Sequence, residues 1–247
     1  MLPLVMLAVT QSGAPQPHLA ARAQPPPPLF ALPVVAQLHV DVEKDRVVVT
    51  HEIVMARGEW SGGDVDLWIS FGPTMPRALD ARLLAVRANA TAPDPADAGE
   101  PIAHDALARR PSRAYALIGR STMAGVVLHV REPAFRRATA ASGVLALRVR
   151  QVLAPPTPDA QNARELVVRL GMESGPPLTV RRIAMTTSEP DGFITQASAQ
   201  FCGPNADPYD VGFHVAPRGA RTTPGAIDPT AATRRSTDDL CVRYVTP

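Results

Sequence analysis

Residues 37–55 read QLHVDVEKDRVVVTHEIVM, and their alternation of apolar and polar side chains decides the fold class. Successive side chains of a β-strand point to opposite faces, so apolar residues at every second position form one row. Two such rows flank a turn at residues 44–45: Leu38, Val40 and Val42 before it, and Val47, Val49, Ile53 and Met55 after it. We expect a β-hairpin in which Val42 lies opposite Val47, which places both rows on the same side.

The same period of two recurs along the rest of the chain. Strands are expected at residues 65–71, 124–132, 144–153, 165–172 and 178–186, with shorter ones at 193–201, 209–215 and 241–245. Stretches rich in Gly, Pro, Ser and Asp separate them and are typical of turns. This pattern indicates a mainly β protein: an antiparallel β-sandwich or barrel-like sheet with one or two short helices and long Pro/Gly-rich loops.

Two stretches show a helical pattern instead. Residues 76–88, PRALDARLLAVRA, place Leu79, Leu83 and Val86 at the i, i+4, i+7 spacing of one helix face. Residues 103–110 fit two helical turns that a following proline would end. We therefore predict the helices of this protein at these two places.

The composition is that of a folded protein with a modest net charge. Of 247 residues, 45% are hydrophobic, so the chain can bury a substantial core. The net charge of +2 gives no indication of a nucleic-acid partner. Lys44 is the only lysine among 25 basic residues, a bias typical of a GC-rich bacterial genome. We expect one β-rich domain over residues 34–247, and the alternative is a domain boundary near residues 154–159.

The N-terminus resembles an export signal in part. Residues 2–9, LPLVMLAV, are apolar, and Ala21-Arg22-Ala23 supplies a small-x-small cleavage pattern. We predict a signal peptide over residues 1–23, a Pro-rich lead segment over 24–33, and a periplasmic or secreted protein. No other stretch is apolar enough to span a membrane in the mature chain. The missing basic residue near Met1 leaves an alternative open, a cytoplasmic protein with a disordered N-terminal tail.

The chain contains two cysteines, Cys202 and Cys241, and both lie among turn residues near the C-terminus. They form no CxxC motif, and no histidine stands at ligand spacing from them. In an oxidising compartment such a pair predicts one disulfide. It would staple the C-terminal loop region, residues 202–241, which has little apolar periodicity of its own.

No sequence motif predicts a metal, a cofactor or a catalytic nucleophile. Residues 119–123, GRSTM, lack the last glycine of a nucleophile elbow. His39 and Asp41 share a strand face, but the hairpin pairing puts His51 on the other face, which disfavours a three-ligand site. We therefore predict no cofactor and no metal.

The sharpest surface prediction is a basic face. Three predicted strands place apolar residues in one row and basic residues in the other, and the basic set is His129, Arg131, Arg148, Arg150 and Arg169. If these strands are neighbours, the five side chains gather on one sheet face and could hold a carboxylate, phosphate or sulfate group. The alternative is an ordinary solvated face.

Two classes of function follow from these observations. The first is a non-enzymatic binding or structural module of the bacterial cell envelope or extracellular space, whose partner is an unknown protein or an anionic envelope ligand. The second is a hydrolase-like enzyme whose site assembles from scattered residues such as His104, Asp105 and Ser121. Clustering of His104 with an activated serine or aspartate would favour the enzyme, and a flat Arg-lined sheet face would favour the binding module.

Overall fold

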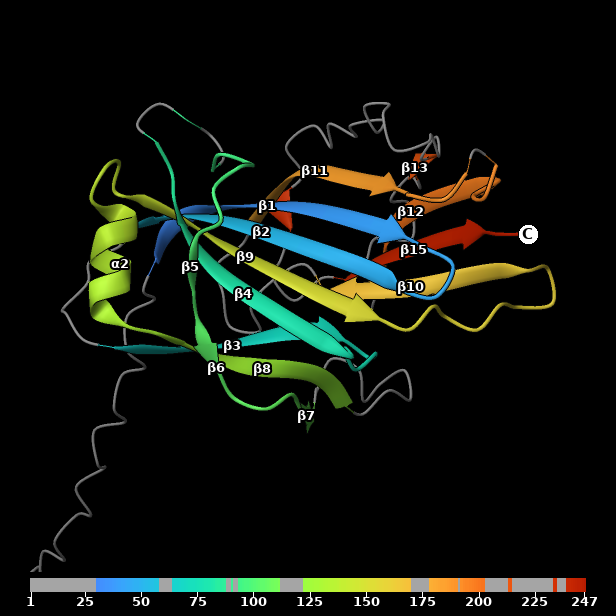
Figure 1. The fold of residues 1–247 in the computed structure, drawn as a ribbon, viewed down its shortest axis with the longest axis horizontal. Coiled ribbons are helices and arrows are strands. Elements are labelled where there is room, and N and C mark those ends of the chain that lie inside the picture. The colour runs from blue at the N-terminus through green and yellow to red at the C-terminus, as the bar shows by residue number, and fades with distance from the viewer. Residues whose placement is uncertain are drawn as a thin grey trace, which may run out of the picture.

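Figure 1 shows a computed structural model of the chain, and the protein is built almost entirely from β-strands. The residues it describes are 30–57, 64–87, 90, 93–111, 122–169, 178–190, 192–202, 213–214, 233–234 and 239–247. The predicted signal peptide and most of the Pro-rich lead lie outside them. Residues 30–33, which we assigned to that lead, belong instead to the first strand.

The strands and the helix follow one another in this order: β1 (Phe30–Val42), β2 (Val47–Arg57), β3 (Val65–Gly72), β4 (Ala78–Ala85), β5 (Glu100–Pro101), β6 (Ala103–His104), β7 (Ala108–Pro111), β8 (Thr122–Val130), α2 (Glu132–Thr139), β9 (Val144–Leu153), β10 (Ala163–Arg169), β11 (Leu178–Thr186), β12 (Gln196–Cys202), β13 (Phe213–His214), β14 (Thr233–Arg234) and β15 (Asp239–Val245). No helix in the described part of the chain is long and apolar enough to cross a membrane.

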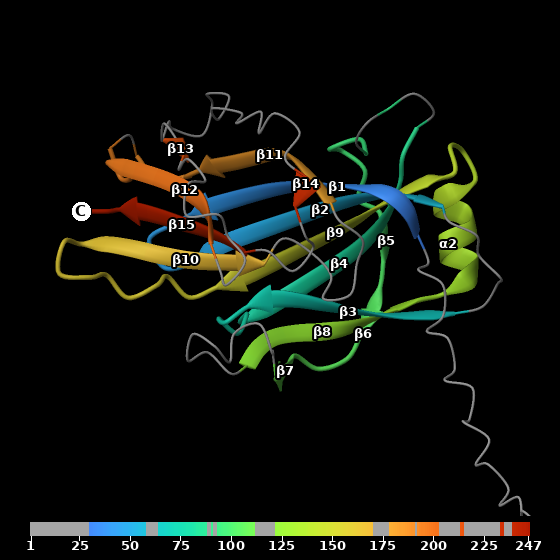
Figure 2. The same cartoon turned by 180° about the vertical axis from the view of Figure 1, so that it is seen from behind.

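These strands form three sheets. Sheet A has seven strands in the order β14-β11-β1-β2-β9-β4-β5, and all of its neighbours run antiparallel except β1 and β11. Sheet B contains β3, β8, β6 and β7, and sheet C has the order β10-β15-β12-β13. Sheet A forms one layer, and sheets B and C lie behind it in Figure 1 and before it in Figure 2. The result is the sandwich-like β fold predicted from the sequence.

The hairpin of β1 and β2 forms as predicted. Val42 pairs with Val47, Val40 pairs with Val49, and His51 lies opposite Leu38. These residues are buried, because their row faces the interior between the layers. One cluster of buried apolar side chains includes residues of all three sheets, for example Leu147 in sheet A, Leu128 in sheet B and Val242 in sheet C.

Both predicted helices are wrong. Residues 78–85 form β4, a strand between β9 and β5, and residues 103–104 and 108–111 form β6 and β7. The helical spacing of Leu79, Leu83 and Val86 arises because this segment buries residues on both faces: Leu83 on the inner face, and Val86, directly after β4, on the outer. The one helix among the described residues is α2, which has a proline in its first turn and packs Phe135 into the core.

Candidate functional site

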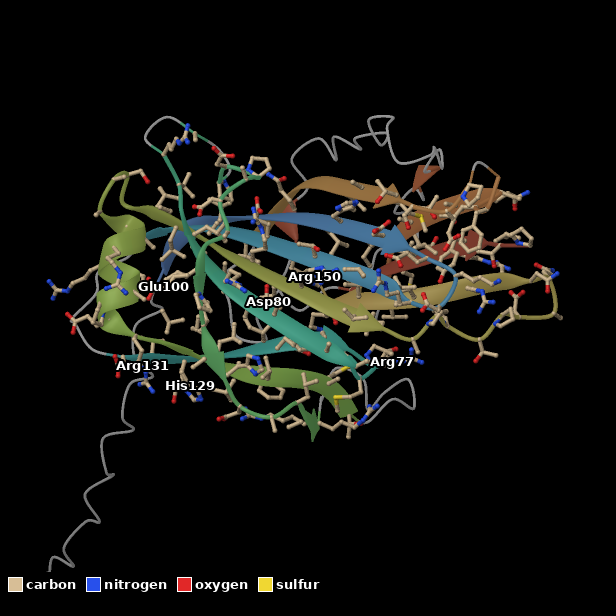
Figure 3. All side chains as sticks on the ribbon, viewed as in Figure 1. Arg77, Asp80, Glu100, His129, Arg131 and Arg150 are labelled. Atoms are coloured by element: carbon tan, nitrogen blue, oxygen red, sulfur yellow. A yellow bond between two sulfur atoms is a disulfide. The ribbon has the colours of Figure 1, made fainter. Side chains whose placement is uncertain are left out.

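The five basic residues predicted to share one face lie in or beside three different sheets. Arg148 and Arg150 are on β9 of sheet A, His129 is on β8 of sheet B with Arg131 directly after it, and Arg169 is on β10 of sheet C. Figure 3 shows His129 and Arg131 well away from Arg150. The condition for the five-residue patch, that these strands are neighbours, is therefore not met: Arg148 and Arg150 share one face, and His129 and Arg131 lie together elsewhere, beside Asp66 and Asp64.

Arg169 is buried rather than solvated. Its Nε donates to Oδ1 of Asp239 at 3.0 Å, and neither side chain exposes more than 1% of its surface. The two residues are direct neighbours across β10 and β15. A buried charge must be paired to be tolerated, so Arg169 has a structural role on the face of sheet C turned away from sheet A.

The disulfide lies beside this ion pair. Cys202 and Cys241 are bonded, with their Cα atoms 5.8 Å apart, as predicted from the sequence. Cys202 pairs in register with Asp239, and Cys241 pairs with Gln200, so the bond runs diagonally between β12 and β15. It joins two strands that are already hydrogen-bonded neighbours.

The outer face of sheet A carries the charged residues of the candidate site. We call this surface the charged face and define it by Thr50 and Glu52 on β2, Arg148 and Arg150 on β9, and Asp80 and Arg82 on β4. These side chains form two rows across the strands, because Thr50, Arg150 and Asp80 are paired in register, and so are Glu52, Arg148 and Arg82. Figure 3 shows Arg150 and Asp80 side by side on this face.

The charges of the Glu52 row are largely neutralised within the protein. Arg148 donates from Nε and Nη2 to one carboxylate oxygen of Glu52, at 3.1 and 3.0 Å, and from Nη1 to the carbonyl of Asp97 at 2.9 Å. In the neighbouring row, the carboxylate of Asp80 accepts from Nε of Arg82 at 2.9 and 3.1 Å. Both acidic groups of the charged face are thus already occupied.

Arg150 is different. It is exposed, and within the described residues its guanidinium takes part in no ion pair or side-chain hydrogen bond. Its row continues through the hydroxyl of Thr50 to His39 on β1, which pairs with Thr50 in register. The row therefore offers an exposed cation with hydrogen-bonding side chains beside it, on the outer face of sheet A.

His39, at the β1 end of this row, also belongs to a polar network with Thr186 and Asp41. Its Nε2 lies 2.7 Å from the hydroxyl of Thr186, and that hydroxyl donates to Asp41 at 3.1 Å. The hydroxyl proton is directed to Asp41, so Nε2 of His39 serves as the donor to Thr186. This arrangement fixes the ring of His39 at the end of the row.

A stretch that we call the crossover segment, residues 93–105, borders the charged face. It passes over the outer row of Val54, Ala146 and Leu84, which are buried. A Cβ at Gly99 would lie 2.9 Å from Cγ of Leu84, so this close passage requires glycine, whose φ of +67° also favours it. Two short strands lie within this segment. β5 pairs with β4 of sheet A and β6 pairs with β8 of sheet B, so the segment joins the two sheets.

His129 stands at the end of that segment, on the outer face of sheet B. Its Nδ1 lies 2.7 Å from Oδ1 of Asp66, and its Nε2 lies 3.0 Å from Oδ1 of Asp105. Hydrogen bonds to Asp66 and then Asp105 raise the pKa of His129 above its ordinary value. Sequence reasoning identified His129 but not these partners, which lie 63 and 24 positions away along the chain.

The residues suggested for a hydrolase are not assembled in the described part of the protein. His104 directs Nδ1 to the backbone carbonyl of Asp105, while the Asp105 carboxylate faces His129. Ser121 lies outside the described residues. Within the part of the chain that the structure describes, no group of three or more His, Cys, Asp and Glu side chains is placed to hold a metal ion.

No family model matches the chain, and no curated protein matches it either.

Proposed function

We propose that this chain is a non-enzymatic binding module of the bacterial envelope or extracellular space, and that it holds anionic groups of a polymeric ligand on its charged face. The single observation that carries the proposal is Arg150. Its guanidinium is exposed on the open face of sheet A, while the nearby carboxylates of Glu52 and Asp80 already have arginine partners. Among the described residues, no carboxylate is paired with this guanidinium, so an incoming anion can bind it.

The row containing Arg150 suits a small anionic group. Adjacent strands lie about 4.8 Å apart, so the three positions His39, Thr50 and Arg150 span about 10 Å, the length of one or two sugar rings. A guanidinium binds carboxylate, phosphate or sulfate through two parallel hydrogen bonds, and the Thr50 hydroxyl can supply a third. Because the row runs across the strands, it is suited to a polymer that lies in the same direction.

The proposed location agrees with the covalent structure. Disulfides persist in oxidising compartments and are rare in the bacterial cytosol, so the Cys202–Cys241 bond supports a periplasmic or secreted protein. Mass spectrometry of the protein recovered from its native host tests this directly. Mature protein that begins after Ala23 and lacks free thiols is the expected result, and recovery of the intact N-terminus with two free thiols contradicts it.

Binding is tested with three polysaccharides that differ in charge: polygalacturonate, which carries carboxylates, dextran sulfate, and uncharged dextran. Isothermal titration calorimetry at low salt should detect the two anionic polymers only. Arg150→Glu should weaken this binding by about tenfold or more, since a charge-assisted hydrogen bond contributes about 1.5–3 kcal/mol. The matched control is Arg77→Glu, which changes an exposed arginine directly before β4 whose guanidinium likewise takes part in no ion pair among the described residues.

The two variants carry the same change in net charge, so they separate a site from general attraction. Equal weakening by both variants would show that the polymers bind only through the overall charge, and the proposal would be wrong. Selective loss in the Arg150 variant supports the site. A preference for polygalacturonate over dextran sulfate would identify the carboxylate as the preferred group, and the reverse preference would identify the sulfate or phosphate type.

A further inference from the structure

Both side-chain contacts of His129 can be hydrogen bonds at the same time only when its ring carries two protons. Each ring nitrogen faces a carboxylate oxygen, Nδ1 at 2.7 Å and Nε2 at 3.0 Å. A carboxylate only accepts hydrogen bonds, and a neutral imidazole has a single N–H. The neutral ring can therefore satisfy Asp66 or Asp105, and the other carboxylate would then face a nitrogen lone pair.

We propose that His129 is a pH-sensitive latch, which fastens the crossover segment to sheet B through Asp105 when the imidazole is protonated and releases that contact when it is neutral. The two carboxylates differ in how they are held. Asp66 is part of β3 and is paired with His129 across the strands. Asp105 follows β6 in a short irregular stretch. The neutral ring is expected to keep its hydrogen bond to Asp66 and to lose the one to Asp105.

Solvent has access to the latch, so its protonation follows the pH of the medium. The side chain of His129 is 22% exposed, and those of Asp66 and Asp105 are 65% and 60% exposed. The other charged or titratable groups on the elements packed here are His104 beside Asp105, Arg131 and Glu132 after β8, and Asp64 before β3. Arg131 opposes protonation of the ring, but its guanidinium is paired with Asp64 at 2.6 Å.

The sign of the pH dependence follows from the raised pKa of His129. A histidine whose pKa is higher in the folded protein stabilises the fold fully below its ordinary pKa of about 6.5. That contribution is lost as the pH rises through the higher folded value. The latch is therefore closed in acid and opens as the medium becomes neutral or alkaline.

The backbone supplies a local reporter of the latch. The amide of Asp105 donates to the carbonyl of Val127 at 3.0 Å, so its hydrogen exchange measures detachment of this segment from β8. Exchange is measured by NMR on the full chain between about pH 5 and pH 9 and is divided by the intrinsic rate at each pH. Protection of the Asp105 amide should fall several-fold as the pH rises, with a midpoint equal to the pKa of His129 in a ring-proton titration.

Two variants make the test specific. In His129→Gln, protection of the Asp105 amide should not change with pH, because glutamine does not titrate. In the matched control His104→Gln, the pH dependence should persist, because the neighbouring histidine contacts only the Asp105 backbone. The amide of Val126 in the core reports whether each variant is folded.

Three results would overturn the proposal. These are a ring pKa of His129 at or below its ordinary value, protection at Asp105 that is independent of pH in the unmodified protein, and unchanged pH dependence in His129→Gln. Asp105→Asn gives a second check, since it keeps the shape of the side chain and removes its charge. It should lower the ring pKa of His129 while leaving the protein folded, and an unchanged ring pKa would equally refute the latch.

Discussion

Removal of the Cys202–Cys241 bond should destabilise the protein by an amount that can be worked out from the chain. The two cysteines are 39 positions apart, and the chain-entropy relation for a loop of that length gives about 4 kcal/mol at 25 °C. The bond joins β12 and β15, which are already hydrogen-bonded to each other. Its effect therefore arises mainly in the unfolded state, where it prevents the two strands from separating.

The measurement is guanidinium unfolding of the Cys202→Ala/Cys241→Ala protein beside the unmodified protein in oxidised and reduced form. The double variant and the reduced protein should lose a similar free energy of unfolding, because they share an open loop and differ only in two sulfur atoms. A domain has about 5–15 kcal/mol in total, so the loss is a large fraction of the stability. A loss below about 1 kcal/mol in both forms would refute the loop-entropy reasoning.

Three further changes test the core. Gly125→Ala should destabilise the protein by about 1–3 kcal/mol in urea unfolding, because its Cβ would lie 2.5 Å from the ring of Trp68. An unchanged unfolding midpoint would contradict this. Leu147→Ala should cost about 3–5 kcal/mol in the same assay because it opens a cavity between the layers, and a cost under 1 kcal/mol would mean that the layers collapse to fill it. Burial lowers the pKa of His51 to about 4, so the unfolded chain binds one more proton than the folded protein between about pH 6.5 and pH 4. The free energy of unfolding should therefore fall by about 3 kcal/mol as the pH drops through that range. In His51→Gln this acid-dependent component should be absent, and an identical pH profile in variant and parent would show that another group causes it.

The hairpin shows what the sequence can predict in this protein. The alternation in residues 37–55 determined the pairing of β1 with β2 correctly, because the buried row and the turn both lie within one short stretch. The two cysteines likewise led to the right bond, since there was only one way to pair them. In both cases the deciding information was local or had a single solution.

β4 and the basic face show where such reasoning fails. Leu84 and Val86 are buried on the outer face, where Gly99, 15 positions after Leu84, packs against Leu84. Burial on both faces is why residues 76–88 alone showed the apolar spacing of one helix face. Alternation also states which face of a strand a residue occupies but not which sheet the strand joins. Arg169 was therefore predicted to be solvated, although Asp239, 70 positions away, pairs with it in a buried site.

The position of β15 has a consequence for how the protein is made. β15 follows β10 and β12 in the chain but lies between them in sheet C, so those two strands have no shared partner until it has been synthesised. Pairings over such sequence separations are slow to form. A chain that is still being synthesised therefore carries an unfinished second layer, and the thiols of Cys202 and Cys241 come together only when β15 pairs with β12.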